Sequence, residues 1–313
     1  MGEGEVVDVG GMGPSKRPLE DVRVVAEGLV FPEGPVALGD GSVLVTEMRR
    51  GTISRVDPTT GDVVVVAETG GGPNGAAIGP DGALYVCNNG GYEPDYHGGR
   101  IERVDLDTGK VDVLYGSCDG QPLSGPNDIV FDADGNMWFT DTGKFLAEGR
   151  HYGRIHWARP DGSDIRTAMG RVDAPNGIGL SPDGGTLYFA ETLSGRLYRR
   201  AITGEGQLEH DRDHDPATLV CGLPGVQLFD SLAVAADGSV CIGTLIEGVI
   251  TSASADGKDV EQFTLPDELA DPMPTNLCFG GPDHRTAYIT LSETGRLVAC
   301  TWPTPGLALA FDR

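Results

Sequence analysis

Six oxygen-bearing side chains recur at one fixed position of a motif that this chain repeats. In every copy an amide or a carboxylate precedes the acidic residue of a turn by seven positions. The pairs are Glu33 and Asp40, Asn74 and Asp81, Asn127 and Asp134, Asn176 and Asp183, Asp230 and Asp237, and Asn276 and Asp283. Hard oxygen donors favour Ca²⁺, with Mg²⁺ or Mn²⁺ next, and the lack of His and Cys disfavours Zn²⁺ without excluding it. The pattern predicts one divalent cation.

The repeat also predicts the elements that hold these side chains. Its best-formed copy, GPNDIVFDADGNMWFTDT at residues 125–142, reads as two short apolar strands joined by an Asp-Gly turn. Successive copies lie between 41 and 54 residues apart. A period of this length with about four strands per unit is typical of a β-propeller blade. We therefore expect an all-β protein, a six-bladed β-propeller of four-stranded blades.

The ends of the chain predict how the ring closes. The last repeat lacks an obvious fourth strand, and a strand-like segment, Val22 to Gly28, precedes the first repeat. Pairing this segment with Arg296 to Thr301 would seal the ring and remove exposed edges. We expect a flexible segment at residues 1–21 and a single domain at 22–313. The tail from Gly306 to Phe311 is ambiguous and could add a strand.

Strand direction places the six oxygen-bearing residues around the axis at one mouth of the propeller. The same mouth carries two long loops, 90–99 and 143–153, and long inserts on a rigid scaffold commonly bind ligands. These loops contain Tyr92, Tyr96, His97, Lys144, Phe145, His151 and Tyr152. We expect Asn74, Asn127, His97, His151 and Tyr152 to contact a substrate.

We call the six oxygen-bearing residues around the axis the ring residues. An alternative role for them is to cap the inner strands through hydrogen bonds to loop backbone. For Asn74 and Asn276 this alternative is as good as ligand binding. It is weaker for Glu33 and Asp230, because two buried carboxylates facing one axis are costly unless something neutralises them.

Composition excludes some partners. A formal charge of −24 argues against nucleic acid and anionic membranes, which need basic surfaces. The six cysteines show no CxxC spacing, which favours buried free thiols in a reducing compartment. No signal-peptide core and no run of 18 apolar residues is present. We expect a cytoplasmic protein, a monomer or a weak homodimer.

Five stretches carry a family resemblance: FPEGP with Glu33, SGPNDIVFDADGNMWFTDT with Asn127, APNGIGLSPDGGTLYFAET with Asn176, LFDSLAVAADG with Asp230, and PTNLCFGG with Asn276. Together they resemble the senescence marker protein/regucalcin/gluconolactonase family of six-bladed propellers, whose neighbour is diisopropyl fluorophosphatase. The likeness spans about residues 22 to 302. It implies that Glu33, Asn176 and Asp230 hold a divalent ion, typically Ca²⁺ or Zn²⁺, and that Asn127 is a fourth ligand or orients the substrate.

The resemblance implies a metal-dependent lactonase of the gluconolactonase type, acting on a small-molecule lactone. A bound ion would polarise the lactone carbonyl, with Asp230 as the base that activates water or, less favoured, as a nucleophile. One position departs from the family, because its animal branch has an arginine where this chain has Gly125. Sugar recognition would then fall to Arg150, His151 or the loop from Tyr92 to His97. The alternatives are a phosphotriesterase or aryl-esterase on the same ion, and a non-catalytic binding propeller.

Overall fold

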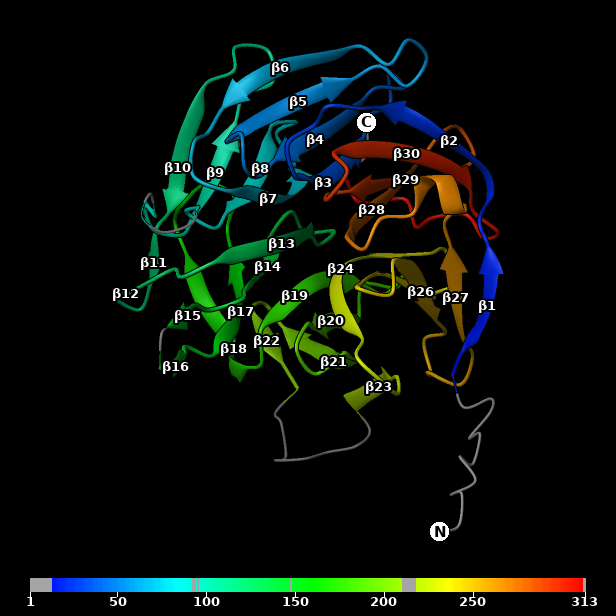
Figure 1. Cartoon of the computed structure of the whole chain (residues 1–313). Helices are drawn as coiled ribbons and strands as arrows, with labels where there is room; N and C mark the ends of the chain where they lie inside the picture. Colours follow the sequence, from blue (N-terminus) through cyan, green and yellow to red (C-terminus); the bar gives the residue numbers. More distant parts are fainter. Residues whose placement is uncertain (1–12, 92–93, 95, 147, 210–217, 312–313) are drawn as a thin grey trace.

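Six antiparallel sheets surround a central axis in the computed structural model, which describes residues 13–91, 94, 96–146, 148–209 and 218–311 (Figure 1). The fold is a six-bladed β-propeller, as the repeats predicted. Most of the described residues lie in strands and turns, and the short 3₁₀ helix η2 (Asp267–Leu269) precedes blade 6.

Each blade starts at the axis and runs outward. Blades 1 and 2 consist of β3 (Pro32–Ala37), β4 (Val43–Glu47), β5 (Thr52–Val56) and β6 (Val63–Glu68), and of β7 (Pro73–Ile78), β8 (Leu84–Asn88), β9 (Arg100–Val104) and β10 (Val111–Tyr115). Blade 3 consists of β13 (Pro126–Phe131), β14 (Met137–Asp141), β17 (Gly153–Ala158) and β18 (Ile165–Val172). Two small hairpins flank it, β11 (Ser117–Cys118) with β12 (Gln121–Pro122) and β15 (Phe145–Leu146) with β16 (Gly149–Arg150).

Blades 4 to 6 follow the same plan with additions at their outer edges. Blade 4 consists of β19 (Pro175–Leu180), β20 (Thr186–Glu191) and β21 (Arg196–Gly204), with β22 (Gln207–Leu208) and β23 (Leu219–Gly222) both paired to β21. Blade 5 contains β24 (Leu228–Val234), β25 (Val240–Leu245), β26 (Val249–Ala253) and β27 (Val260–Thr264). Blade 6 contains β28 (Pro274–Gly280), β29 (Thr286–Leu291), β30 (Arg296–Thr301) and β2 (Glu20–Ala26).

The N-terminal strand closes the ring. β2 pairs antiparallel with β30, so the predicted closure is confirmed. A second N-terminal strand, β1 (Ser15–Pro18), was not predicted; it lies within the segment expected to be flexible and adds to β27 in parallel. Its basic side chains pair with acidic ones of blade 5, Lys16 with Glu247 at 2.9 Å and Arg17 with Glu261 at 3.3 Å.

The core lies between neighbouring blades, where the apolar faces of their sheets pack together. Its largest fully buried side chains include Trp138, Trp157, Tyr85, Phe139 and Phe189. All six cysteines are free and five of them are buried, which agrees with the thiols expected from their spacing.

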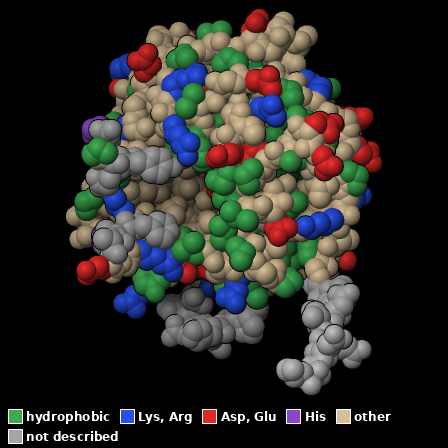
Figure 2. Space-filling view, in the orientation of Figure 1, with side chains coloured by type: hydrophobic (Ala, Val, Ile, Leu, Met, Phe, Trp, Pro, Cys, Tyr) green, Lys and Arg blue, Asp and Glu red, His purple; other side chains and the backbone are tan. Residues whose placement is uncertain are grey.

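On the face seen in Figure 2, hydrophobic side chains gather near the middle with charged ones around them. Within the described part of the chain, no helix has the length and hydrophobicity needed to cross a membrane.

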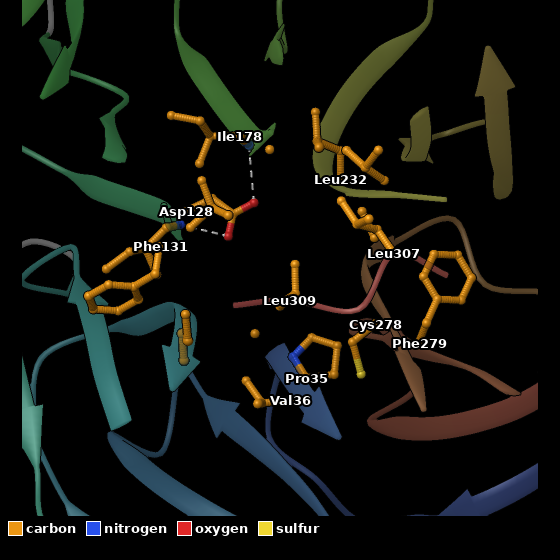
Figure 3. A pocket seen from close by; sticks show the side chains of 18 of the residues that line it. Pro35, Val36, Asp128, Phe131, Ile178, Leu232, Cys278, Phe279, Leu307 and Leu309 are labelled. Atoms are coloured by element: carbon orange, nitrogen blue, oxygen red, sulfur yellow. Dashed lines mark hydrogen bonds between the residues drawn. The ribbon is translucent and has the colours of Figure 1, made fainter. Parts of the chain in front are cut away.

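The C-terminal tail adds no strand to a blade and instead crosses the end of the channel opposite the mouth. It is held by hydrogen bonds from Gly306 N to His284 O at 2.7 Å and from Leu307 N to Val234 O at 3.0 Å. A Cβ at Gly306 would lie 2.1 Å from Phe279, so only glycine fits here. Figure 3 shows the tail segment with Leu307 and Leu309 crossing the channel. With the inner strands, the tail lines an apolar cavity of about 100 Å³.

Candidate metal centre

A β-bulge places each ring residue. In all six inner strands the pairing register with the second strand shifts beside that residue, as between Glu33 and Val36 in β3 and between Pro126 and Ile129 in β13. A bulge bends its strand and re-aims the neighbouring side chain. Because the bulge recurs in every blade, residues that are equivalent in the repeat are also equivalent around the axis.

The position after the ring residue sets how closely the inner strands approach. A Cβ on Gly34 would lie 2.3 Å from Asn74 O, and one on Gly177 would lie 2.6 Å from Leu232 N. Gly34 also has a φ of +42°, a region that side chains disfavour. Neighbouring blades therefore meet at their bulges, and the ring residues are held by backbone packed against backbone.

Glu33 and Asp230 form the acidic centre of the site. Their exposed fractions are 3% and 6%. Burial raises the pKa of Glu33 well above its ordinary value, and the nearby carboxylates of Asp230 and Asp128 raise it further. Burial also raises the pKa of Asp230 to about 7, against the lowering effect of a hydrogen bond with the Asn176 side chain. The structure thus brings together three of the four predicted ligands, Glu33, Asn176 and Asp230.

Asp128 is a third buried carboxylate, which the sequence reasoning did not assign to the site. Its carboxylate accepts hydrogen bonds from the backbone N–H of Ile129 at 3.0 Å and of Ile178 at 3.3 Å (Figure 3). Burial raises its pKa to about 7, although these N–H groups oppose the rise. The signal was present, because blade 3 reads PND where blades 2 and 4 read PNG, which puts a carboxylate at the bulge in place of Gly75 or Gly177.

Unsatisfied oxygens show that these residues fit a cation. Glu33 Oε2, Asn74 Oδ1 and Asn127 Oδ1 are buried and have no hydrogen-bond partner. Leaving such atoms unpaired costs about 1–3 kcal/mol each, whereas a hard cation would satisfy them. No three His, Cys, Asp or Glu side chains of the described residues are arranged to hold a metal ion. The predicted set draws only Glu33 and Asp230 from those residue types; its other two members are amides.

Asn276 takes the capping role and Asn74 does not. The side-chain oxygen of Asn276, Oδ1, accepts a hydrogen bond from Leu277 N at 2.7 Å, and the backbone N–H of Asn276 donates to Thr290 Oγ1 at 3.0 Å. The Asn74 amide nitrogen instead lies 3.7 Å from Met48 Sδ, and its oxygen is unpaired. Asn74 therefore keeps an oxygen free for a ligand, while the Asn276 side chain is used within its own strand.

The predicted substrate-binding residues of the long loops lie at the surface of the mouth. His97 and His151 are exposed, and Tyr152 is 58% exposed with the Arg150 guanidinium 5.7 Å from its ring. Arg150 forms an ion pair with Asp173. Tyr92 lies outside the described residues.

Two further loop side chains are held against each other and against the backbone. Lys144 Nζ lies 3.0 Å from the ring centroid of Tyr96, whose hydroxyl donates to Ser124 O at 2.8 Å. Gly125 leaves little room for a side chain, because its Cβ would lie 3.0 Å from Gly143 O. A long side chain at position 125 would therefore require the loop to shift.

The fold and the site define a class: a six-bladed propeller with buried carboxylates and amides at one end of its axis. A family model described as "SMP-30/Gluconolactonase/LRE-like region" matches residues 31–293. The chain belongs to this family, which confirms the resemblance seen in the sequence.

Named relatives lie at moderate sequence distance. The lactonase drp35 of Staphylococcus haemolyticus is 24% identical over 256 residues, covering 79% of this chain and 72% of the relative. A gluconolactonase of Zymomonas mobilis is 27% identical over 191 residues, covering 55% and 51%. Both names support lactone hydrolysis as the activity of this kind of protein.

Solved structures agree on the fold. A regucalcin of Agrobacterium tumefaciens, described as a calcium-binding protein, superposes with a TM-score of 0.76 at 18% identity and covers 96% of this chain and 99% of its own. A gluconolactonase of Xanthomonas campestris gives a TM-score of 0.71 at 22% identity, covering 94% and 99%. At these identities the likeness establishes the architecture alone.

Proposed function

We propose that this protein is a metal-dependent lactonase. The observation that carries the proposal is the pair of neighbouring buried carboxylates, Glu33 and Asp230, together with the unpaired buried oxygen of Asn127 at the equivalent position of blade 3. Such an arrangement is costly by itself, and a divalent cation would remove the cost. The names of the relatives support the lactone, and the calcium-binding description of the regucalcin supports Ca²⁺ ahead of Zn²⁺, Mg²⁺ or Mn²⁺.

The chain's own residues divide the chemistry among themselves. Glu33, Asn127, Asn176 and Asp230 would hold the cation. When bound, the cation would polarise the lactone carbonyl and offset the negative charge that develops on its oxygen. Asp230 takes the proton from the attacking water, because its carboxylate can lie beside both water and carbonyl. Asn127 orients the carbonyl without changing the charge of the site.

A screen of sugar, aliphatic and aryl lactones tests the proposal. Protein stripped with EDTA should be inactive, and Ca²⁺ should restore turnover. In Asp230→Asn, the loss of a general base should lower kcat by about 10²- to 10⁴-fold. Asp237→Asn is the matched control, because Asp237 is an exposed turn residue of the same blade and should leave kcat unchanged.

Two outcomes would replace the proposal. Protein that binds Ca²⁺ with both carboxylates but hydrolyses no lactone is a binding propeller. Turnover of phosphotriesters or aryl esters without turnover of lactones would assign a different reaction to the same residues.

A further inference from the structure

The unpaired oxygens of the ring residues gather in three successive blades. Glu33 Oε2, Asn74 Oδ1 and Asn127 Oδ1 belong to blades 1, 2 and 3, and each is buried without a hydrogen-bond partner among the described residues. In blade 4 the equivalent oxygen is engaged, since Asn176 Oδ1 accepts a hydrogen bond from Ser231 Oγ at 3.3 Å. One half of the ring therefore presents three acceptors in need of a cation or a donor.

Asn74 lies between Glu33 and Asn127, because its strand β7 packs between β3 and β13. A Cβ on Gly34, the residue after Glu33, would lie 2.3 Å from Asn74 O. A Cβ on Gly75, the residue after Asn74, would lie 2.6 Å from Asn127 O. Asn74 is thus flanked by two of the four residues that are expected to hold the cation.

The thioether of Met48 determines which end of the Asn74 side chain faces the ring. The amide nitrogen of Asn74 lies 3.7 Å from Met48 Sδ, and the amide nitrogen of Asn89 lies 3.3 Å from the same sulfur. A thioether sulfur is a weak acceptor and has no hydrogen to donate, so it favours an amide N–H over an amide oxygen. With its nitrogen held by the sulfur, Asn74 keeps its oxygen for the ring.

Met48 is itself held in place. It is 5% exposed, and its backbone N–H donates to Phe31 O at 3.0 Å. Asn89, the second donor to the sulfur, is fixed through its own Oδ1, which accepts from Gly91 N at 2.9 Å. A Cβ on Gly72 would lie 2.2 Å from this oxygen, so the space around Asn89 is filled. The sulfur is therefore an acceptor at a fixed position beside the ring.

We propose that Met48 is a positioning residue of the metal centre: its sulfur holds the amide nitrogen of Asn74, so that Asn74 Oδ1 becomes a fifth side-chain ligand of the cation. This inference rests on the metal dependence in the proposed function. Ca²⁺ takes about six to eight oxygen ligands, more than the four predicted side chains supply with one oxygen each. Asn74 is neutral, so it enlarges the ligand set without changing the charge of the site.

Calorimetric titration with Ca²⁺ tests the inference without relying on turnover. Met48→Leu conserves volume but removes the acceptor, which frees the Asn74 amide to turn its N–H groups toward the cation. Loss of a residue that orients a metal ligand weakens metal binding by about 10- to 100-fold, and we expect a Kd for Ca²⁺ about tenfold higher. Met137→Leu is the matched control, because Met137 is fully buried in the core of blade 3, and it should leave the Kd unchanged.

Combined substitutions separate positioning from a general disturbance of the fold. Asn74→Ala should weaken Ca²⁺ binding at least as much as Met48→Leu, and adding Met48→Leu to it should change the Kd no further. Asn74→Asp needs no positioning, because either carboxylate oxygen can face the cation. In that background Met48→Leu should leave the Kd for Ca²⁺ unchanged, which also shows that the leucine is compatible with folding.

Calcium binding and lactone turnover together distinguish this inference from the lactonase proposal. The expected pattern of Kd values in a protein that hydrolyses no lactone would support the role of Met48 and remove the lactonase activity. Additive effects of Met48→Leu and Asn74→Ala would overturn the role of Met48 and leave lactone hydrolysis standing. A higher KM for lactone at an unchanged Kd for Ca²⁺ in Asn74→Ala would also overturn it, because Asn74 would then contact the substrate. A wild type that binds no Ca²⁺ would overturn it whatever its turnover.

Discussion

The carboxylate of Asp128 on β13 accepts a hydrogen bond from the backbone N–H of Ile178 on β19, at 3.3 Å. The bond ties blade 3 to the neighbouring blade 4 at the channel wall, one residue along β13 from the ring residue Asn127. On its far side lies the apolar cavity that the C-terminal tail covers. Asp128 therefore separates a polar site at the mouth from apolar surface below it.

Replacing Asp128 by alanine should destabilise the protein. The N–H groups of Ile129 and Ile178 would lose their acceptor in a buried place, at a cost of about 1–3 kcal/mol. Urea unfolding measures the change. The control is Asp134→Ala, on the exposed turn of the same blade, which should stay within about 0.5 kcal/mol of the wild type. Equal midpoints for the two variants would show that Asp128 does not tie the blades together.

Metal-free protein should become less stable as the pH rises from about 4 to about 7. Burial raises the pKa of Asp128 and of Asp230 to about 7 and that of Glu33 well above its ordinary value. Unfolded carboxyls lose their protons near pH 4. The folded state thus holds protons that the unfolded state releases, and its extra stability is complete below that pH and lost as the pH rises through the folded values.

Denaturation with chelator present measures this slope, and Ca²⁺ supplies the contrast. A bound cation needs ionised carboxylates, so stabilisation by Ca²⁺ should grow over the same pH range. Stability that stays level or increases with pH in the chelator would contradict the raised pKa values.

Gly34→Ala should disrupt the site far more than a comparable change at a turn. Its Cβ would lie 2.3 Å from Asn74 O at a φ of +42°, so both the backbone and the neighbouring blade oppose it. Gly41 has a φ of +88° with nothing within 4 Å of a Cβ, so Gly41→Ala isolates the backbone cost, about 1 kcal/mol. Calorimetric unfolding should show at least about 2 kcal/mol more loss for Gly34→Ala. Equal losses would mean that the blades do not meet at the bulge.

Removing residues 306–313 should open the end of the channel opposite the mouth. Leu307 and Phe311 cover apolar inner strands, and the Phe311 ring packs edge-on to Phe131 at 5.9 Å. A dye that fluoresces on apolar surfaces should bind the shortened protein and not the wild type, and Tm should fall. Removing only residues 312–313 is the control. Unchanged dye binding in the longer truncation would show that the tail does not cover the channel.

The repeated sequence predicted the fold and the positions of the ring residues on the inner strands, because both depend on local periodicity. Alternating apolar strands and acidic turns define blades, and a residue seven positions before each turn lies at the axis. The role of Asn276 was left open because it depends on register: Asn276 pairs directly with Thr290, and its side chain bonds to its own strand.

Three features lay beyond local periodicity. β1 is fully exposed and short, and it is held by parallel pairing with β27 and by ion pairs to blade 5, none of which a local pattern reveals. The tail is held by backbone bonds to residues distant in sequence. Asp128 was identified as part of the repeat, but its importance comes from Ile178 in another blade.

A crystal structure of the protein grown with Ca²⁺ tests the central claim most directly. We expect one ion at the mouth end of the axis, bound by Glu33, Asn127, Asn176 and Asp230, with the unpaired oxygens of Glu33 and Asn127 among its ligands. A map without an ion between Glu33 and Asp230, from crystals of protein that turns over lactones, would contradict it.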